Sequence, residues 1–116
     1  MLYAYSLFHL NIAYSAIELS SYKEVINKCY WPVLKMASIK NIPLGIELPA
    51  YTLEQIYNID PNWVVEFKRL IDEGKCELVG CGYSQIIGPL VPAKLNKKNI
   101  ELGYKIYLEL LDQKPR

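Results

Sequence analysis

Residues 74–92 read GKCELVGCGYSQIIGPLVP and combine a short apolar run with a long loop. The run from Cys76 to Cys81 is almost wholly apolar rather than alternating, which predicts a strand covered on both faces, as in parallel sheets. We expect this strand to span Lys75–Gly82. The loop of residues 83–92 is longer than a plain connection requires, and long loops beyond the strands of α/β folds often carry ligands. The stretch therefore predicts an α/β protein with a site after this strand.

Two earlier apolar runs predict two further strands. Tyr3–Leu10 is rich in aromatic and apolar residues and lacks helical spacing. Pro43–Leu48 begins with a proline, which can occupy the first position of a strand because no ladder hydrogen bond has to be donated there.

Apolar residues at helical spacing predict a helix after each of these strands. Ser21 and Glu24 form a capping box at the start of the first helix, which Pro32 must kink or restart. Thr52 and Gln55 form a second capping box, which predicts a short helix over residues 52–57.

Two longer helices flank the third strand. Asp60 before Pro61 predicts a helix start with a capping side chain, and Gly74 predicts its C-terminal cap. A last helix begins near Ala93. The alternation of strand and helix, with short connections, predicts three β/α units with parallel strands, as in part of an α/β barrel or doubly wound sheet. Both outer strands then carry unpaired backbone groups unless something covers them.

Length and charge limit the class of protein. The 116 residues, 52% of them hydrophobic, suffice for one core and are too few for two ordinary domains. Thirteen basic and twelve acidic residues give a net charge of +1 without a long charged block, so we expect no nucleic-acid partner. No apolar run is long enough to span a membrane, and the apolar start lacks the basic opening of a signal peptide. We therefore expect no membrane partner.

The three cysteines are Cys29, Cys76 and Cys81, an odd number without a C-x-x-C pair, which is typical of reduced cytoplasmic thiols. Cys76 and Cys81 point to opposite faces of one strand, and His9 is the only histidine, so no metal site is predicted. We interpret the cysteines as small buried hydrophobic residues. Gly80-x-Gly82 lacks the third glycine of a dinucleotide fingerprint, and no cofactor is expected.

Polar and aromatic side chains follow each predicted strand, at the edge where parallel α/β folds bind ligands. Aromatic rings beside amides and a carboxylate suit a sugar, because its C–H faces lie on rings while its hydroxyls need donors and acceptors. The predicted substrate-binding residues are His9, Asn11, Glu47, Tyr51, Tyr83 and Gln85.

Several of these residues also have a structural explanation. Ten tyrosines in 116 residues place some in loops by chance, and a lone histidine such as His9 is often a partly buried structural residue. Glu47 could act as a general acid, accept a substrate hydroxyl, or cap the helix that begins near Thr52. Glu77 lies near the start of its strand, which predicts a structural hydrogen-bond or ion-pair partner.

Three segments resemble the catalytic domain of glycoside hydrolase family 57. They are Phe8-His9-x-Asn11, Gly45-Ile46-Glu47 with Leu53-Glu54, and Gly74-Lys75-Cys76-Glu77-Leu78-Val79-Gly80-x-Gly82-Tyr83 continuing to Pro89-Leu90-x-Pro92. The resemblance covers nearly the whole chain. It implies that residues 1–116 are a single N-terminal portion of a (β/α)7 barrel that acts on α-glucans or related polysaccharides.

The chain departs from the family pattern near the site. Asn11 and the two residues after it stand where the family has a second histidine followed by Gln-Pro, and Gln85 stands where a histidine or glutamate is frequent. In the family, the nucleophilic glutamate comes from the fourth strand and the acid/base aspartate from a later one. Retaining hydrolysis uses two carboxylates about 5 Å apart, and the three predicted strand ends offer no such pair. We therefore expect no catalytic residue within residues 1–116.

Two functions are consistent with these features. In the first, the chain is the N-terminal segment of a retaining glycoside hydrolase, inactive alone and active only if the protein continues beyond Arg116. In the second, it is a non-catalytic carbohydrate-binding or assembly module that acts as an oligomer. The expected partners are an oligo- or polysaccharide and either a second copy or the rest of the barrel. Metal-dependent deacetylation is disfavoured, because that chemistry needs histidines at ligand spacing.

Overall fold

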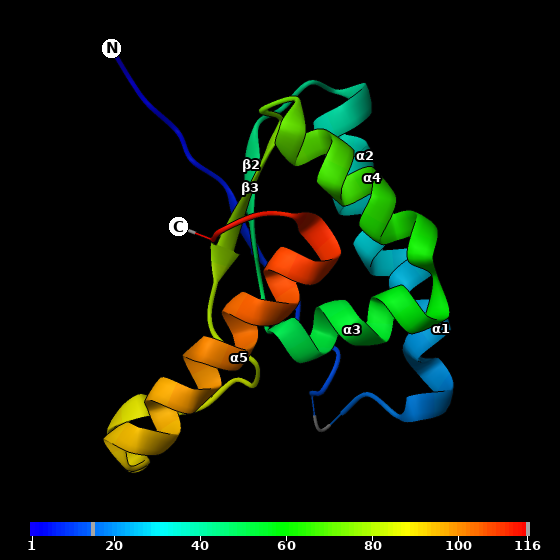
Figure 1. Ribbon diagram of the computed structural model, residues 1–116. Helices are drawn as coiled ribbons and strands as arrows, with labels where there is room; N and C mark the ends of the chain where they lie inside the picture. The colour runs from blue at the N-terminus through cyan, green and yellow to red at the C-terminus, as the bar shows by residue number, and fades with distance from the viewer. Residues whose placement is uncertain (15, 116) are drawn as a thin grey trace.

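The computed structural model describes residues 1–14 and 16–115. In this part of the chain, β1 (Leu7–His9), β2 (Leu44–Leu48) and β3 (Cys76–Gly80) form one sheet with the order β1-β2-β3 (Figure 1). Both strand pairs are parallel, which confirms the predicted α/β fold. Each strand is shorter than predicted at one or both ends, because ladder pairing stops where the neighbouring strand no longer runs alongside.

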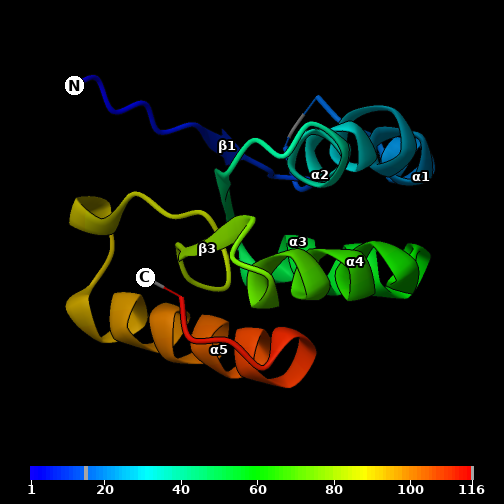
Figure 2. The same cartoon turned by 90° about the horizontal axis from the view of Figure 1, so that it is seen from above.

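Helices follow each strand, and Figure 2 shows α1 to α4 gathered on one side of the sheet. After β1 come η1 (Leu19–Ser21), α1 (Tyr22–Val25), the π-helix η2 (Ile26–Tyr30) and α2 (Trp31–Ile39). After β2 come α3 (Ala50–Ile59) and α4 (Pro61–Asp72), and after β3 come η3 (Gly88–Leu90) and α5 (Ala93–Leu111). None of the helices in the described residues is long and apolar enough to cross a membrane.

A π-helical turn precedes Pro32, and α2 restarts there, as predicted. Proline lacks the amide proton of a regular helical turn, and the wider π turn accommodates that loss. The predicted capping box of Ser21 and Glu24 is wrong. Ser21 already has helical dihedral angles as the last residue of η1, whereas a capping serine needs an extended backbone, and its side chain makes no capping hydrogen bond.

Thr52 and Asp60 connect separate parts of the chain instead of capping helices. The α3 helix begins two residues before Thr52, whose Oγ1 accepts a hydrogen bond from the Ile12 backbone N–H at 3.2 Å. The predicted capping box with Gln55 is therefore wrong. Asp60 directly precedes α4 as predicted, but its Oδ2 accepts a hydrogen bond from Trp31 Nε1 at 2.7 Å and makes no capping hydrogen bond.

Gly74 ends α4 in the predicted way. Its φ of +71° lies in the left-handed region that favours glycine. Its N–H donates to the Ile71 carbonyl at 2.9 Å, and the Lys75 N–H donates to the Leu70 carbonyl at 2.8 Å. These two bonds form a Schellman motif, which turns the chain directly from α4 into β3.

The sheet has one face covered by helices and one open face. Ile46 and Leu78 point toward the helices and are buried in the core. Because side chains alternate along a strand, the residues between them project from the other side. Leu7 on that side is 48% exposed. We define the open face by its residues Leu7, His9, Gly45, Glu47, Glu77 and Val79.

The expectation that β3 is covered on both faces is wrong. Cys76 and Leu78 are buried, whereas Glu77 and Val79 on the open face are only half-buried. An apolar run with weak alternation does not distinguish a strand with two covered faces from one with a single covered face.

Tyr107 of α5 joins the ends of β2 and β3. Its ring is fully buried, and its hydroxyl donates to the Leu48 carbonyl at 2.6 Å and lies 3.2 Å from the Gly82 carbonyl. Burial raises the pKa of the Tyr107 hydroxyl, which therefore remains a donor at neutral pH. A single hydroxyl thus lies between two carbonyls at the point where the strands separate.

The cysteines differ in exposure, and all three are free thiols. Cys76 is buried and Cys81 half-buried, and burial raises the pKa of both thiols to about 11. Cys29 is exposed, so its interpretation as a buried hydrophobic residue is wrong. It lies in the π-helical segment, on a surface that the core does not cover.

We expect Tyr107→Phe to lower the free energy of unfolding by about 1–3 kcal/mol, because it removes the hydroxyl that donates to the buried Leu48 carbonyl. Urea unfolding followed by circular dichroism measures this change. Tyr104→Phe, at a 42% exposed position on the same helix, is the matched control and should change stability by less than about 0.5 kcal/mol. Equal stabilities of the two variants would contradict this role of the Tyr107 hydroxyl.

At neutral pH, a thiol-specific aromatic disulfide should modify Cys29 rapidly and should reach Cys76 and Cys81 only after unfolding. The reacting species is the thiolate, and thiols with a pKa of about 11 are almost fully protonated under these conditions. Mass spectrometry counts the modified sites. The Cys29→Ser variant should lose the rapid reaction, and rapid labelling of Cys81 in that folded variant would show that its thiol is accessible after all.

Candidate functional site

His9 and Glu47 lie side by side on the open face, because they are partners in the register of β1 and β2. His9 Nδ1 is 3.8 Å from Glu47 Oε1, which is longer than a hydrogen bond and becomes an ion pair when the imidazole is protonated. The Glu47 side chain is 25% exposed, so its carboxylate remains accessible. The alternative that Glu47 caps a helix is wrong, since α3 begins after Pro49 without a side-chain cap and Glu47 is still within the strand.

Cys81 also lies near Glu47, a neighbour that the sequence pattern did not single out. Burial and then the charge of Glu47 raise the pKa of this thiol, so it can serve as a donor to the carboxylate. The ladder register contains the signal for this contact. Val79 pairs with Glu47, and Cys81 two residues later projects to the same side.

Tyr51 and Tyr83 form an aromatic pair beyond β2 and β3. Their ring centroids are 6.0 Å apart with an interplanar angle of 79°, which is an edge-to-face arrangement. The neighbouring Glu54 carboxylate, followed by burial, raises the pKa of Tyr83. Burial and then the neighbouring Tyr51 hydroxyl raise the pKa of Tyr22. The two rings therefore pack against each other with polar groups close to their hydroxyls.

The backbone after β3 completes the first turn of α3. The Ala50 N–H donates to the Gly82 carbonyl at 2.9 Å, and the Tyr51 N–H donates to the Tyr83 carbonyl at 2.9 Å. The first amides of a helix lack partners within the helix, and these carbonyls supply two of them. On the other side, the Tyr83 N–H donates to the Asn99 carbonyl of α5 at 2.9 Å. Two helices thus fix the position of Tyr83.

Asn11 and Gln85 lie apart from these two pairs. Asn11 is half-buried after β1, and Gln85 is exposed in the loop before η3. Within residues 1–14 and 16–115, no hydrogen bond joins either side chain to the other four predicted residues. The structure therefore brings four of the six predicted residues together as two pairs, His9 with Glu47 and Tyr51 with Tyr83.

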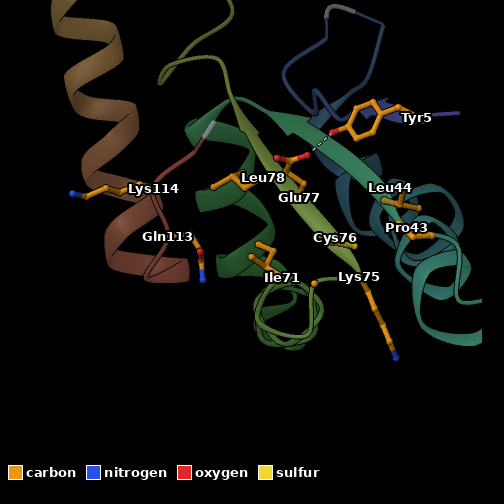
Figure 3. A pocket seen from close by; sticks show the side chains of 11 residues that line it. Tyr5, Pro43, Leu44, Ile71, Lys75, Cys76, Glu77, Leu78, Gln113 and Lys114 are labelled. Carbon is orange, nitrogen blue, oxygen red and sulfur yellow. Dashed lines mark hydrogen bonds between the residues drawn. The ribbon is translucent and has the colours of Figure 1, made fainter. Parts of the chain in front are cut away.

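Three pockets of the molecule are lined by other residues. One of them, about 410 Å³, surrounds the first half of β3 between Tyr5 and Gln113 (Figure 3). Within it, the Tyr5 hydroxyl donates to Glu77 Oε2 at 3.0 Å, which confirms Glu77 as a hydrogen-bond partner. A second pocket of about 300 Å³ lies at the other end of β3, between Cys81 and α5. The third, about 200 Å³, lies between α3 and α5. The candidate site is therefore a surface rather than one of these pockets.

The chemistry available at this surface is that of binding. Glu47 can accept hydrogen bonds from hydroxyl groups, and the two tyrosines provide apolar ring surface. The polar neighbours of Glu47 are an imidazole and a thiol. Among the residues that the structure describes, no group of three His, Cys, Asp or Glu side chains is arranged to hold a metal ion.

Comparison with known proteins identifies the fold and the family. A solved 4-alpha-glucanotransferase from Thermococcus litoralis superposes with a TM-score of 0.84 at 18% sequence identity, over 96% of this chain and 17% of that enzyme. No curated protein sequence gives a significant match. The three β/α units thus form a partial (β/α) barrel, as the resemblance implied, and span about a sixth of the length of that enzyme. Residues 5–116 match the model of glycosyl hydrolase family 57, and the chain belongs to this family.

Proposed function

We propose that residues 1–116 supply the sugar-contacting residues of a family 57 barrel that acts on α-glucan or a related polysaccharide. One observation carries the proposal. The pairs His9 with Glu47 and Tyr51 with Tyr83 lie at the carboxyl ends of adjacent parallel strands, where α/β barrels bind substrates. Membership of the glycosyl hydrolase family supports a carbohydrate as the ligand.

Each pair has a separate role in this proposal. Glu47 accepts hydrogen bonds from sugar hydroxyls, with His9 beside it as a further polar contact. Tyr51 and Tyr83, packed edge to face, present ring surface to the C–H face of the sugar. Asn11 and Gln85 extend the surface at its margin, where their amides can both donate and accept.

The chain by itself binds without cleaving the glycosidic bond in this proposal. Retaining hydrolysis needs two carboxylates about 5 Å apart. Glu47, the carboxylate of the first pair, has His9 and Cys81 as its polar neighbours, and Glu54 lies beside Tyr83. The catalytic carboxylates would then be supplied by further strands of a barrel. The three free thiols support a reducing, cytoplasmic location.

The free edge of β3 favours a second function, that of an assembly module. In the described sheet β3 pairs only with β2, and pockets of about 410 and 300 Å³ lie at its two ends. Unpaired strand edges readily take up another strand. We propose that this edge pairs with another strand, contributed either by further β/α units or by a second copy of the chain.

Glu47→Gln and Tyr83→Ala should each weaken binding of maltoheptaose to the full-length protein by roughly three- to tenfold, since each removes one charged acceptor or one ring face. Isothermal titration calorimetry measures the affinity. Tyr57→Ala, at a 47% exposed position of α3 outside both pairs, is the control and should bind like the wild type. If both site variants bind as tightly as this control, the assignment of the site is wrong.

The assembly function predicts a concentration-dependent dimer of residues 1–116 in sedimentation velocity experiments. We expect exposed strand edges to pair in this dimer. A Leu78→Pro variant cannot test this pairing, because the loss of a backbone N–H within β3 also disrupts the pairing of β3 with β2. Dilution over about two orders of magnitude in concentration should instead shift the sedimentation coefficient. A folded monomer at every concentration would exclude self-assembly and leave the sugar-binding proposal unaffected.

A further inference from the structure

Asn99 of α5 is bound to the two residues that follow Gly82 by three hydrogen bonds. Its backbone carbonyl accepts from the Tyr83 N–H at 2.9 Å. Its side-chain Oδ1 accepts from the Ser84 N–H at 2.8 Å, and its Nδ2 donates to the Ser84 carbonyl at 3.0 Å. A side-chain amide carries both a donor and an acceptor, so Asn99 pairs with Ser84 as a neighbouring strand would.

Two glycines allow α5 to approach this closely. A Cβ atom on Gly103 would lie 2.6 Å from the carbonyl carbon of Gly82, and one on Gly82 would lie 2.3 Å from Asn99 Nδ2. Gly82 also has a φ of +96°, which other residues rarely adopt. The backbones of α5 and of the segment after β3 are therefore in direct contact, and the Asn99 amide lies within this contact.

The same segment is held from the opposite side by α3. The Tyr83 carbonyl accepts from the Tyr51 N–H at 2.9 Å, and the Tyr83 ring packs edge-to-face with Tyr51. The helix α3 thus orients the ring, while Asn99 fixes the backbone from which the ring projects. Ser84 is exposed to solvent, so loss of the two Asn99 side-chain bonds would leave it tied to α5 only through the Tyr83 N–H.

We propose that Asn99 is a positioning residue for sugar binding. It does not touch the sugar, but it fixes the backbone of Tyr83 and Ser84 and thereby places the Tyr83 ring against Tyr51. This inference rests on the proposed function, because it takes Tyr83 to be a sugar contact. Its structural part, the restraint of the two backbone amides, is measurable without a sugar.

Asn99→Ala and Asn99→Asp test this role in the full-length protein. Alanine removes both side-chain bonds. Aspartate keeps the size of the side chain but replaces the donor with a charged oxygen that faces the Ser84 carbonyl, so a residue needed only for packing would tolerate it. Asn96→Ala is the matched control, one turn earlier on the same helix and without a hydrogen bond to this segment.

Three readouts apply to each variant: amide hydrogen exchange of Tyr83 and Ser84 by NMR, affinity for maltoheptaose, and the midpoint of urea unfolding. For both Asn99 variants we expect exchange of the Ser84 amide to be at least about tenfold faster and affinity to be roughly three- to tenfold lower. The Asn96→Ala control should match the wild type in both. If Asn99→Ala also lowers the urea midpoint of unfolding, its faster exchange could reflect lower stability. In that case exchange and affinity are compared for Asn99→Asp, which keeps the size of the side chain.

The structural part of this proposal and its binding part can be contradicted separately. Unchanged exchange of both amides in the Asn99 variants would show that Asn99 does not restrain the segment. Faster exchange with wild-type affinity would show that the restraint has no role in binding. Failure of the wild-type protein to bind maltoheptaose would contradict the proposed function for this sugar and, with it, the binding role of Asn99, while the exchange data would still report whether the backbone restraint exists.

Discussion

Beyond the ends of β2 and β3, the two backbone segments diverge. The backbone groups that follow the strands therefore need new hydrogen-bond partners. The buried Tyr107 hydroxyl provides one, between the carbonyls of Leu48 and Gly82. The first amides of α3 provide others, because they donate to the carbonyls of Gly82 and Tyr83. An unsatisfied buried polar group is costly, so this requirement holds the two strands, α3 and α5 in one arrangement.

The same hydrogen bonds shape the surface at which a sugar is proposed to bind. The carbonyl that completes the first turn of α3 belongs to Tyr83, so the helix start and the aromatic pair are parts of one structure. The Tyr51 and Tyr83 rings pack edge to face and project from backbones that these hydrogen bonds fix, so the rings provide the contact surface. Aromatic rings held in this way lose little conformational entropy when a ligand binds.

The open face presents a different chemistry. Glu47 remains accessible beside His9, and its charge together with burial raises the pKa of the nearby Cys81 thiol. Family 57 membership places these groups in the setting of carbohydrate chemistry, and in the described sheet β3 pairs only with β2. The face that carries the polar groups is thus also the face that the described helices leave uncovered.

Local chemistry in the sequence was enough to predict the order of the elements, their parallel arrangement, the glycine cap at Gly74 and the restart of the helix at Pro32. Each of these depends on residues close together in the chain. The capping boxes failed because Thr52 bonds to Ile12 and Ser21 lies in a preceding helical turn. Cys29 was misjudged because composition says nothing about which side of a helix meets the core.

The sequence by itself determined the α/β fold, since hydrophobic periodicity and the alternation of strands and helices specify it, and it predicted six site residues at or after the strands. Only the tertiary structure decided which of them meet. His9 and Glu47, Tyr51 and Tyr83, and Ser84 and Asn99 are pairs from different β/α units or elements, and they come together through strand register and helix packing. Hydrogen-bond partners distant in sequence leave no local pattern, so their contacts appear only once the chain is folded.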